Sequence, residues 1–316
     1  MITQRELADL AGLTQASISL ALRGSARIAP ETRSRVAELA RKHGYRADPA
    51  IEALAHRRWG KKRPLAIAYL ASRSVFGRDR YADGVAARCS ELGVRLWTIP
   101  RRDDVAESLA RRRIAGVVVG QTTLADCTSV FLPPGLRAVH CGLVAPPGPG
   151  DMACADLSAA GPATCAALAE LGFRRIAAAV IADPGSLSDQ FLAGGLLAYA
   201  RTARSERLAV WVGGSGERKI APSWLMAQRA EALIVYDVAI ADALRKAGER
   251  RPIASLIALE ERQDVAGTIL PFELIGERAV DLLLERLRDR QPAPGTRRIE
   301  LVTMPWRDGV SLSSGK

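Results

Sequence analysis

Cationic side chains are crowded into the first fifth of this 316-residue chain. Residues 1–64 hold 13 Lys and Arg against 6 Asp and Glu, a net charge of +7, and the other 252 residues carry only +4 of the total +11. Guanidinium and ammonium groups at this density neutralise phosphates, so the pattern indicates a polyanionic partner for this end of the chain. A solvated basic face is an equally consistent interpretation of the charge alone.

Residues able to do catalysis or bind a metal do not occur in a recognisable pattern. The run GGSGE at 213–217 lacks the lysine and spacing of a P-loop, and GVVVG at 116–120 is typical of a buried strand. Glu260 and Glu261 could imitate paired carboxylates, but adjacent side chains on a strand or at its exit usually point apart. The scattered cysteines and histidines indicate reduced thiols and no zinc site: Cys89, Cys127, Cys141, Cys154 and Cys165, with His43, His56 and His140. We expect no catalytic residues, no metal and no cofactor.

Three short helices are predicted to position the basic end. The first carries apolar residues at helical spacing and stops at Gly12, a natural C-cap. Thr14 offers an N-cap to a second helix, 15–22, and a third begins at Pro30 and stops at Gly44. The three-residue turn between the first two helices has the spacing of a helix-turn-helix, whose second helix enters the DNA major groove. A small helical cap would show the same apolar pattern.

Two stretches of this end resemble the headpiece of the lac-repressor (LacI/GalR) family. They are TQRELADLAGLTQASISLALRG, from residue 3, and IAPETRSRVAELARKHGYRADP, from residue 28. The match is close over the first 55 residues and loose beyond them. The residues in register with the family pattern are Glu6, Leu7, Ala8, Ala11, Gly12, Leu13, Thr14, Ser17, Ile18, Ser19, Leu22, Gly24, Thr32, Arg33, Val36, Gly44 and Tyr45.

The resemblance implies which residues contact DNA. Gln15, Ala16 and Leu20 fall where the family's second helix faces base edges. Gln15 can pair with adenine, and Ala16 can touch a thymine methyl. Leu20 departs from the more usual polar reader, which shifts specificity toward thymine methyls or toward Arg23; packing of Leu20 into the headpiece core is the alternative. Short hydroxyl side chains suit phosphate contacts that fix register: Thr3, Thr14, Ser17, Ser19 and Thr32.

The segment ADPAIEALA, residues 47–55, predicts a short helix with Asp48 as N-cap and Pro49 in its first turn. So few residues do not hold a helix alone in water. In the lac-repressor family this segment is the hinge helix, which orders on the operator, and Leu54 falls where a leucine wedges into the minor groove. Ala47 and Asp48 replace the family's proline and asparagine. An ordinary linker helix is the alternative.

The basic run HRRWGKKRP, with glycine and proline, marks a domain boundary. Beyond it, apolar strands alternate with helices, the rhythm of parallel sheets covered on both faces. Two such halves resemble the periplasmic-binding-protein-like core of the family. The expected fold is therefore an all-α helix-turn-helix headpiece plus an α/β core of two doubly wound parallel-sheet subdomains. The expected divisions are a headpiece, 1–46, a hinge helix and basic linker, 47–63, and a core, 64–316, made of subdomain one (about 64–156 plus 272–303) and subdomain two (about 157–271 plus 304–316).

Ligands of such sheets bind at the carboxyl ends of strands, here in the cleft between the halves. The chain departs there from the sugar-binding members of the family: Phe191 stands at their arginine, Tyr236 at their asparagine and Glu260 at their aspartate. Phenylalanine cannot grip sugar hydroxyls with two hydrogen bonds as arginine does. We expect Phe191, Tyr236, Phe272 and Trp211 to stack on a sugar or on a less polar metabolite. Glu260 would then accept from a hydroxyl. Core packing of Phe191 and Phe272 is the alternative, as is a cleft that responds to a partner protein or to nothing.

These observations predict a cytoplasmic, homodimeric transcriptional regulator, a repressor, that binds a near-palindromic double-stranded operator and is modulated by a small molecule. Arg5, Glu6 and Asp9 interrupt the start before a secretion signal develops, and no apolar stretch is long enough to span a membrane. The first alternative is a solute (sugar)-binding module without a transcriptional role. A sugar-processing enzyme is the third interpretation, and the chain is expected not to be an enzyme.

Overall fold

The computed structural model describes eleven stretches of the chain: residues 4–22, 28–43, 65–71, 79–100, 105–112, 114–120, 132, 136–142, 150–202, 208–288 and 296–312. The contacts divide the chain into two compact units, Met1–Arg63 and Pro64–Lys316. Each unit is therefore described by itself.

The described residues of the first unit form three helices, α1 (Gln4–Ala11), α2 (Gln15–Leu22) and α3 (Pro30–Lys42). Leu7, Ile18 and Val36, one from each helix, are fully buried against one another. Gly12 ends α1 with a left-handed φ of 64°, a conformation that costs other residues steric strain. The predicted three-helix headpiece is confirmed.

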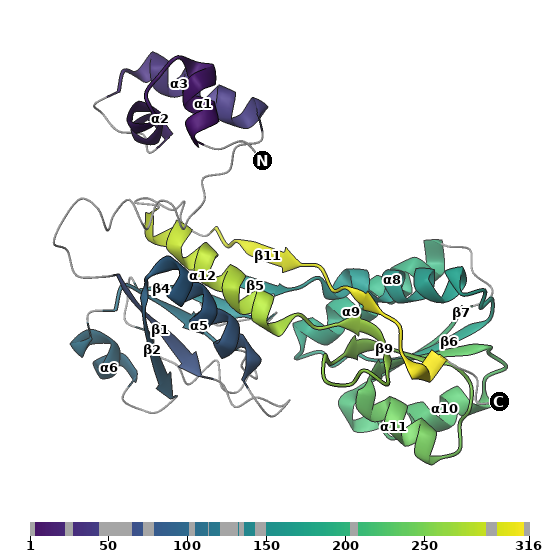
Figure 1. Ribbon diagram of the computed structural model, residues 1–316. Coiled ribbons are helices and arrows are strands. Elements are labelled where there is room, and N and C mark those ends of the chain that lie inside the picture. Colours follow the sequence, from purple (N-terminus) through teal and green to yellow (C-terminus); the bar gives the residue numbers. More distant parts are fainter. Residues whose placement is uncertain are drawn as a thin grey trace. The chain divides into compact units, whose positions relative to one another are not determined.

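The second unit is built on two separate sheets (Figure 1). The first has the order β11-β5-β4-β3-β1-β2 and is parallel throughout. Helices α5 and α12 pack together, and α12 crosses β3, β4 and β5, while α6 covers apolar side chains of β1 and β3. The elements of this subdomain one are β1 (Ala66–Ala71), α5 (Arg80–Leu92), β2 (Arg95–Pro100), α6 (Val105–Arg111), β3 (Gly116–Val119), β4 (Arg137–Cys141), β5 (Asp151–Ala155), α12 (Phe272–Arg288) and β11 (Ile299–Val302).

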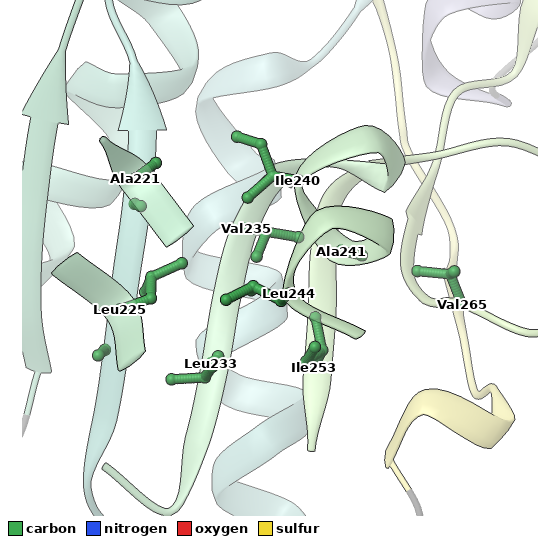
Figure 2. Close-up of a cluster of buried hydrophobic side chains, with 11 residues drawn as sticks. Ala221, Leu225, Leu233, Val235, Ile240, Ala241, Leu244, Ile253 and Val265 are labelled. Atoms are coloured by element: carbon green, nitrogen blue, oxygen red, sulfur yellow. The ribbon is translucent and has the colours of Figure 1, made fainter. Parts of the chain in front are cut away.

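The second sheet has the order β12-β10-β9-β8-β6-β7, with only β12 antiparallel among its described strands. Leu225 of α10 and Leu244 of α11 pack with Leu233 and Val235 of β8 (Figure 2). Helices α8 and α9 pack against each other and against the sheet. The elements of this subdomain two are α8 (Leu157–Glu170), β6 (Ile176–Ile181), α9 (Leu187–Thr202), β7 (Leu208–Gly213), α10 (Ala221–Ala227), β8 (Ala232–Asp237), α11 (Val238–Lys246), β9 (Ile253–Ala258), β10 (Ala266–Ile269) and β12 (Trp306–Arg307).

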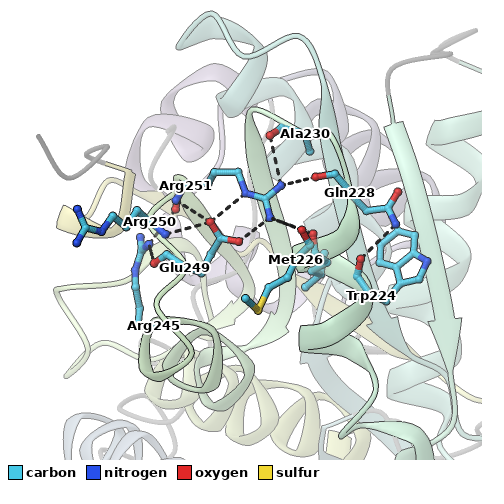
Figure 3. A network of polar contacts seen from close by, with 9 residues as sticks. Trp224, Met226, Gln228, Ala230, Arg245, Glu249, Arg250 and Arg251 are labelled. Carbon is cyan, nitrogen blue, oxygen red and sulfur yellow. Dashed lines mark hydrogen bonds and ion pairs between the residues drawn. The ribbon is translucent and has the colours of Figure 1, made fainter.

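A network of hydrogen bonds and an ion pair holds α10 against the turn that follows α11 (Figure 3). Arg251 pairs with Glu249 and donates to the backbone carbonyls of Gln228, at 2.6 Å, and Leu225, at 3.1 Å. A guanidinium can satisfy several carbonyls at once, because its five N–H groups are held in one plane. This network stabilises subdomain two near the amino ends of β8 and β9, since Gln228 precedes β8 and Arg251 precedes β9.

The chain crosses between the sheets three times, after β5, after β10 and after β11. The crossing after β5 is joined to the crossing after β11 by a backbone hydrogen bond from Asp156 N to Val302 O, at 2.8 Å. The end of β10 is bonded to the same segment after β11, since Ile269 N donates to Pro305 O, also at 2.8 Å. Each subdomain is thus assembled from segments distant in sequence. The predicted fold class, a helical headpiece and two doubly wound subdomains, is confirmed.

Candidate functional site

The first candidate site is α2 of the headpiece. Ser17 N donates to Thr14 Oγ1 at 3.1 Å, which is the N-cap predicted from the sequence. Ile18 and Ala21 are buried in the core, and Ser17 and Leu20 are half-buried. Leu20 does not belong to the described headpiece core, so it is placed outside the group of side chains that hold the three helices together.

The other predicted DNA contacts are placed to differing extents. Thr32 lies half-buried near the start of α3. Gln15, Ala16 and Ser19 belong to α2, but the positions of their side chains lie outside what the structure describes. Also outside the described residues are Thr3, Arg23 and Leu54, together with the hinge helix and basic linker, 47–63. The roles of these residues remain predictions.

The second candidate site lies at the carboxyl ends of the strands of subdomain two. The Tyr236 hydroxyl, at the end of β8, donates to Asp189 Oδ1 at 2.5 Å, and Asp189 is a buried carboxylate in the first turn of α9. Burial raises the pKa of Tyr236 above its ordinary value, and the bond to Asp189 acts in the same direction. Tyr236 is therefore neutral. Its hydroxyl donates its proton to the hydrogen bond with Asp189, and its oxygen can still accept a hydrogen bond.

Arg218 completes this group. Its guanidinium lies over the Tyr236 ring, 5.6 Å from the ring centroid, and forms an ion pair with Asp237. Asp237 in turn caps α11, because its Oδ1 accepts from Ala239 N and Ile240 N at 3.1 and 3.2 Å. Arg218 thus covers one face of Tyr236, and the Tyr236 side chain also packs against the apolar cluster shared by β8, α10 and α11.

The remaining predicted ligand residues lie in different surroundings. Phe191 is 43% exposed on α9, which contradicts the alternative that it fills the core. Trp211 packs against the apolar cluster formed by β6, β8, α10 and α11. Phe272 is only 3% exposed and meets Tyr81 edge-to-face, with ring centroids 5.0 Å apart. Phe272 therefore fills the core of subdomain one, as the alternative interpretation had it.

Glu260 belongs to a third group, which centres on Arg80, the first residue of α5. Arg80 Nε donates to Glu273 Oε1 at 2.7 Å, Nη1 donates to Glu261 Oε2 at 3.1 Å, and Nη2 also contacts Glu260. The expectation that Glu260 and Glu261 point apart is wrong, because both carboxylates bind the Arg80 guanidinium from the turn after β9. Burial lowers the pKa of Arg80, but its bonds to Glu273 and Glu260 raise it above the ordinary value overall.

The predicted ligand residues thus separate into clusters instead of forming one ring. Three further residues that could contact or shape a ligand were missed: Asp189, Arg218 and Arg80. Their partners lie 47, 19 and up to 193 residues away in sequence, so no local motif marks them. The one sequence signal was the run Tyr236-Asp237, where an aspartate before an apolar helix predicts an N-cap.

Among the residues that the structure describes, no group of three or more His, Cys, Asp or Glu could hold a metal ion. No helix in the described stretches is long and apolar enough to cross a membrane. Four of the cysteines are buried free thiols, and burial raises the pKa of Cys165 to about 12. A thiol held protonated in this way is a poor nucleophile.

No family model and no curated protein matches the sequence. Solved structures do match in three dimensions. The lac repressor dimer bound to operator and the anti-inducer ONPF matches with a TM-score of 0.58 and 15% identity, covering 98% of this chain and 99% of that chain. The transcriptional regulator CelR in complex with cellobiose matches with a TM-score of 0.58 and 19% identity, covering 98% and 100%. A LacI family transcriptional regulator from Enterococcus faecium with bound ribose matches with a TM-score of 0.54 and 13% identity, covering 79% and 100%.

Two of these likenesses include the headpiece as well as the core, since they cover 98% of the chain. At such identities they establish the fold. The chain has the fold of the LacI-family regulators.

Proposed function

We propose that this protein is a transcriptional regulator of the LacI/GalR type that binds operator DNA through its headpiece. The observation that carries the proposal is the capped helix-turn-helix, α1 and α2, at the beginning of a chain whose core has two ligand-binding-type subdomains. A helix-turn-helix supplies a helix for the major groove, and such a core supplies a means of regulation. Access to DNA places this action in the cytoplasm.

Electrostatics support the same function. The net charge of +7 over residues 1–64 favours binding to phosphates irrespective of sequence, and base contacts from α2 then select the site. Gln15 and Ala16 are the proposed base readers, together with Arg23, and Leu20 is proposed to contribute apolar contact. Two copies of the chain related by a two-fold axis would read a near-palindromic operator. The expected regulatory effect is repression.

The cleft is the proposed site of a small-molecule effector. The groups available to such a ligand on subdomain two are the oxygen lone pairs of Tyr236, the exposed ring of Phe191 and the free guanidinium N–H groups of Arg218. An effector can alter DNA affinity only by binding two arrangements of the core with different affinities. A ligand that uses Glu260 would also have to compete with Arg80.

Selection of bound duplexes from a random DNA pool by the full chain tests the function. We expect enrichment of a two-fold symmetric sequence and a steep linear fall in log affinity as log salt concentration rises, because phosphate contacts release counterions. The selection is repeated with a panel of metabolites, of which an effector should change the fraction of DNA bound. Failure to bind any duplex in dilute buffer contradicts the proposal, and metabolite binding without DNA affinity would favour the solute-binding alternative.

A further inference from the structure

The Arg80 side chain forms ion pairs between the two subdomains of the core. Arg80 belongs to α5 of subdomain one, and Glu260 and Glu261 follow β9 of subdomain two, which lies in the other lobe of the core in Figure 1. The Arg80 side chain is 16% exposed, and those of Glu260 and Glu261 are each 54% exposed. The contact is therefore at a half-solvated rim, where ion pairs form and break readily.

The guanidinium is held in place on its own side of the contact. Glu273 of α12 accepts two parallel hydrogen bonds from Arg80, at 2.7 and 2.9 Å, and the guanidinium lies 5.4 Å from the centroid of the Phe272 ring. Asp79, the residue before Arg80, caps α5 and accepts from the buried Tyr69 hydroxyl at 2.8 Å. Arg80 thus keeps its position and its bidentate partner when the subdomains separate.

The acidic turn is held equally well on the other side. Arg307 of β12 donates to the carbonyls of Leu259 and Glu260 at 2.9 Å each, and to that of Arg262 at 2.7 Å. These bonds fix the backbone on which Glu260 and Glu261 are carried. Because both halves are pre-organised, closure costs little side-chain ordering.

The charges at this contact do not cancel. Three carboxylates, those of Glu260, Glu261 and Glu273, surround the one guanidinium. Without Arg80, Glu273 of subdomain one would face two like charges of subdomain two. Removing the cation should therefore replace an attraction with a repulsion.

We propose that Arg80 is a latch that holds the two subdomains closed by pairing with Glu260 and Glu261 while it remains bound to Glu273. The latch goes beyond DNA binding, since it governs the opening of the core whether or not the headpiece contacts DNA. Arg80 also competes with any ligand for the Glu260 carboxylate, because a ligand group that binds this carboxylate displaces the guanidinium from it.

Pulsed electron spin resonance distances in the full-length chain test the latch directly. Spin labels are placed at the exposed positions Ser90 of α5 and Ala227 of α10 through cysteine substitution, with Cys127 replaced by serine. For two half-exposed ion pairs we expect Arg80→Gln to shift the ratio of closed to open molecules toward the open form by roughly two- to thirtyfold. Arg88→Gln is the matched control, because Arg88 lies on the same helix and its partners, Asp281 and Glu91, are both in subdomain one.

The repulsion is tested by a second variant. Adding Glu260→Gln and Glu261→Gln to Arg80→Gln should restore part of the closed population, which a merely structural role of Arg80 would not do. If Arg80→Gln fails to fold, Glu260→Gln with Glu261→Gln in the native background should open the core by itself. Distance distributions that are the same in the native chain and in every folded variant would overturn the proposal. This outcome leaves DNA binding unaffected, so failure of the latch and failure of the proposed function are distinguishable.

Discussion

The headpiece and the predicted ligand-binding residues of the core form their polar contacts over different distances along the chain. In the headpiece, Leu7, Ile18 and Val36 form an apolar core, and the described polar contact of α2 is local, from Ser17 to Thr14. In the core, charged and polar side chains from distant elements bind one another, as Tyr236 binds Asp189 and Arg80 binds its three glutamates. The headpiece contact is thus encoded within a few residues, whereas those of the core need several elements to be in place.

The difference explains why the resemblance to the family is strong at one end and weak at the other. Phosphates are the same in every duplex, so a headpiece can keep its pattern while a few side chains change the sequence read. A small ligand is recognised by a few side chains from several segments, and each replacement changes the chemistry. A ligand group that binds the Glu260 carboxylate must also displace Arg80, and the lost hydrogen bonds reduce its affinity.

The largest expected effect is a loss of headpiece stability that leaves the stability of the core unchanged. Leu7→Ala should cost about 2–5 kcal/mol of headpiece stability, because it empties a fully buried position in a very small core. Amide hydrogen exchange should show α1 to α3 unprotected and the core unchanged, with loss of operator binding. Leu10→Ala is the control, since Leu10 is 52% exposed on the same helix. Operator binding equal to that of the native chain would contradict the packing described.

The next effect tests whether the polar pair in the cleft is structural. Tyr236→Phe removes the donor to a buried carboxylate and should destabilise subdomain two by about 1–3 kcal/mol in urea unfolding. Tyr199→Phe removes a hydroxyl that forms no hydrogen bond among the described residues, and should have little effect. Equal losses from both changes would mean that the Asp189 contact adds no stability.

An effect of similar size on binding tests base reading by α2. Gln15→Ala should weaken operator binding by about 1–3 kcal/mol and relax the preference at one base pair, because a bidentate contact to adenine is lost. The slope of affinity against salt should stay the same, since no phosphate contact is removed. A variant that keeps the full sequence preference would remove Gln15 from the set of base readers.

The smallest effect concerns the start of α2. Thr14→Ala removes the acceptor for Ser17 N and should cost about 1 kcal/mol of headpiece stability, seen as faster amide exchange in α2. Thr14→Ser keeps the hydroxyl and should exchange like the native chain. If the alanine variant exchanges no faster than the serine variant, the cap has no energetic role.

Local signals predicted most of the elements and missed others for a clear reason. Short sequence patterns mark the headpiece helices, namely the caps and glycines around α1 to α3. The apolar runs of β1, β6 and β8 likewise mark these strands within a few residues. Strands β5, β10 and β12 carry no comparable signal, because Asp151–Ala155 is rich in small residues, β10 contains Gly267, and β12 has only two residues. These strands exist because a neighbouring strand supplies hydrogen bonds and burial, which a single segment does not encode.

The sequence by itself determined the helices of the headpiece and the alternation of strands and helices in the core. It also determined the positions where the family's ligand residues are replaced. Each of these features is a local pattern that spans only a few turns or strands. Only the tertiary structure decided how the predicted ligand residues pair. Arg80 and Glu260 are 180 residues apart on different subdomains, and Tyr236 and Asp189 are 47 apart on different elements of subdomain two. Pairing of charges across such distances follows from the packing of whole elements, and no short stretch of residues specifies it.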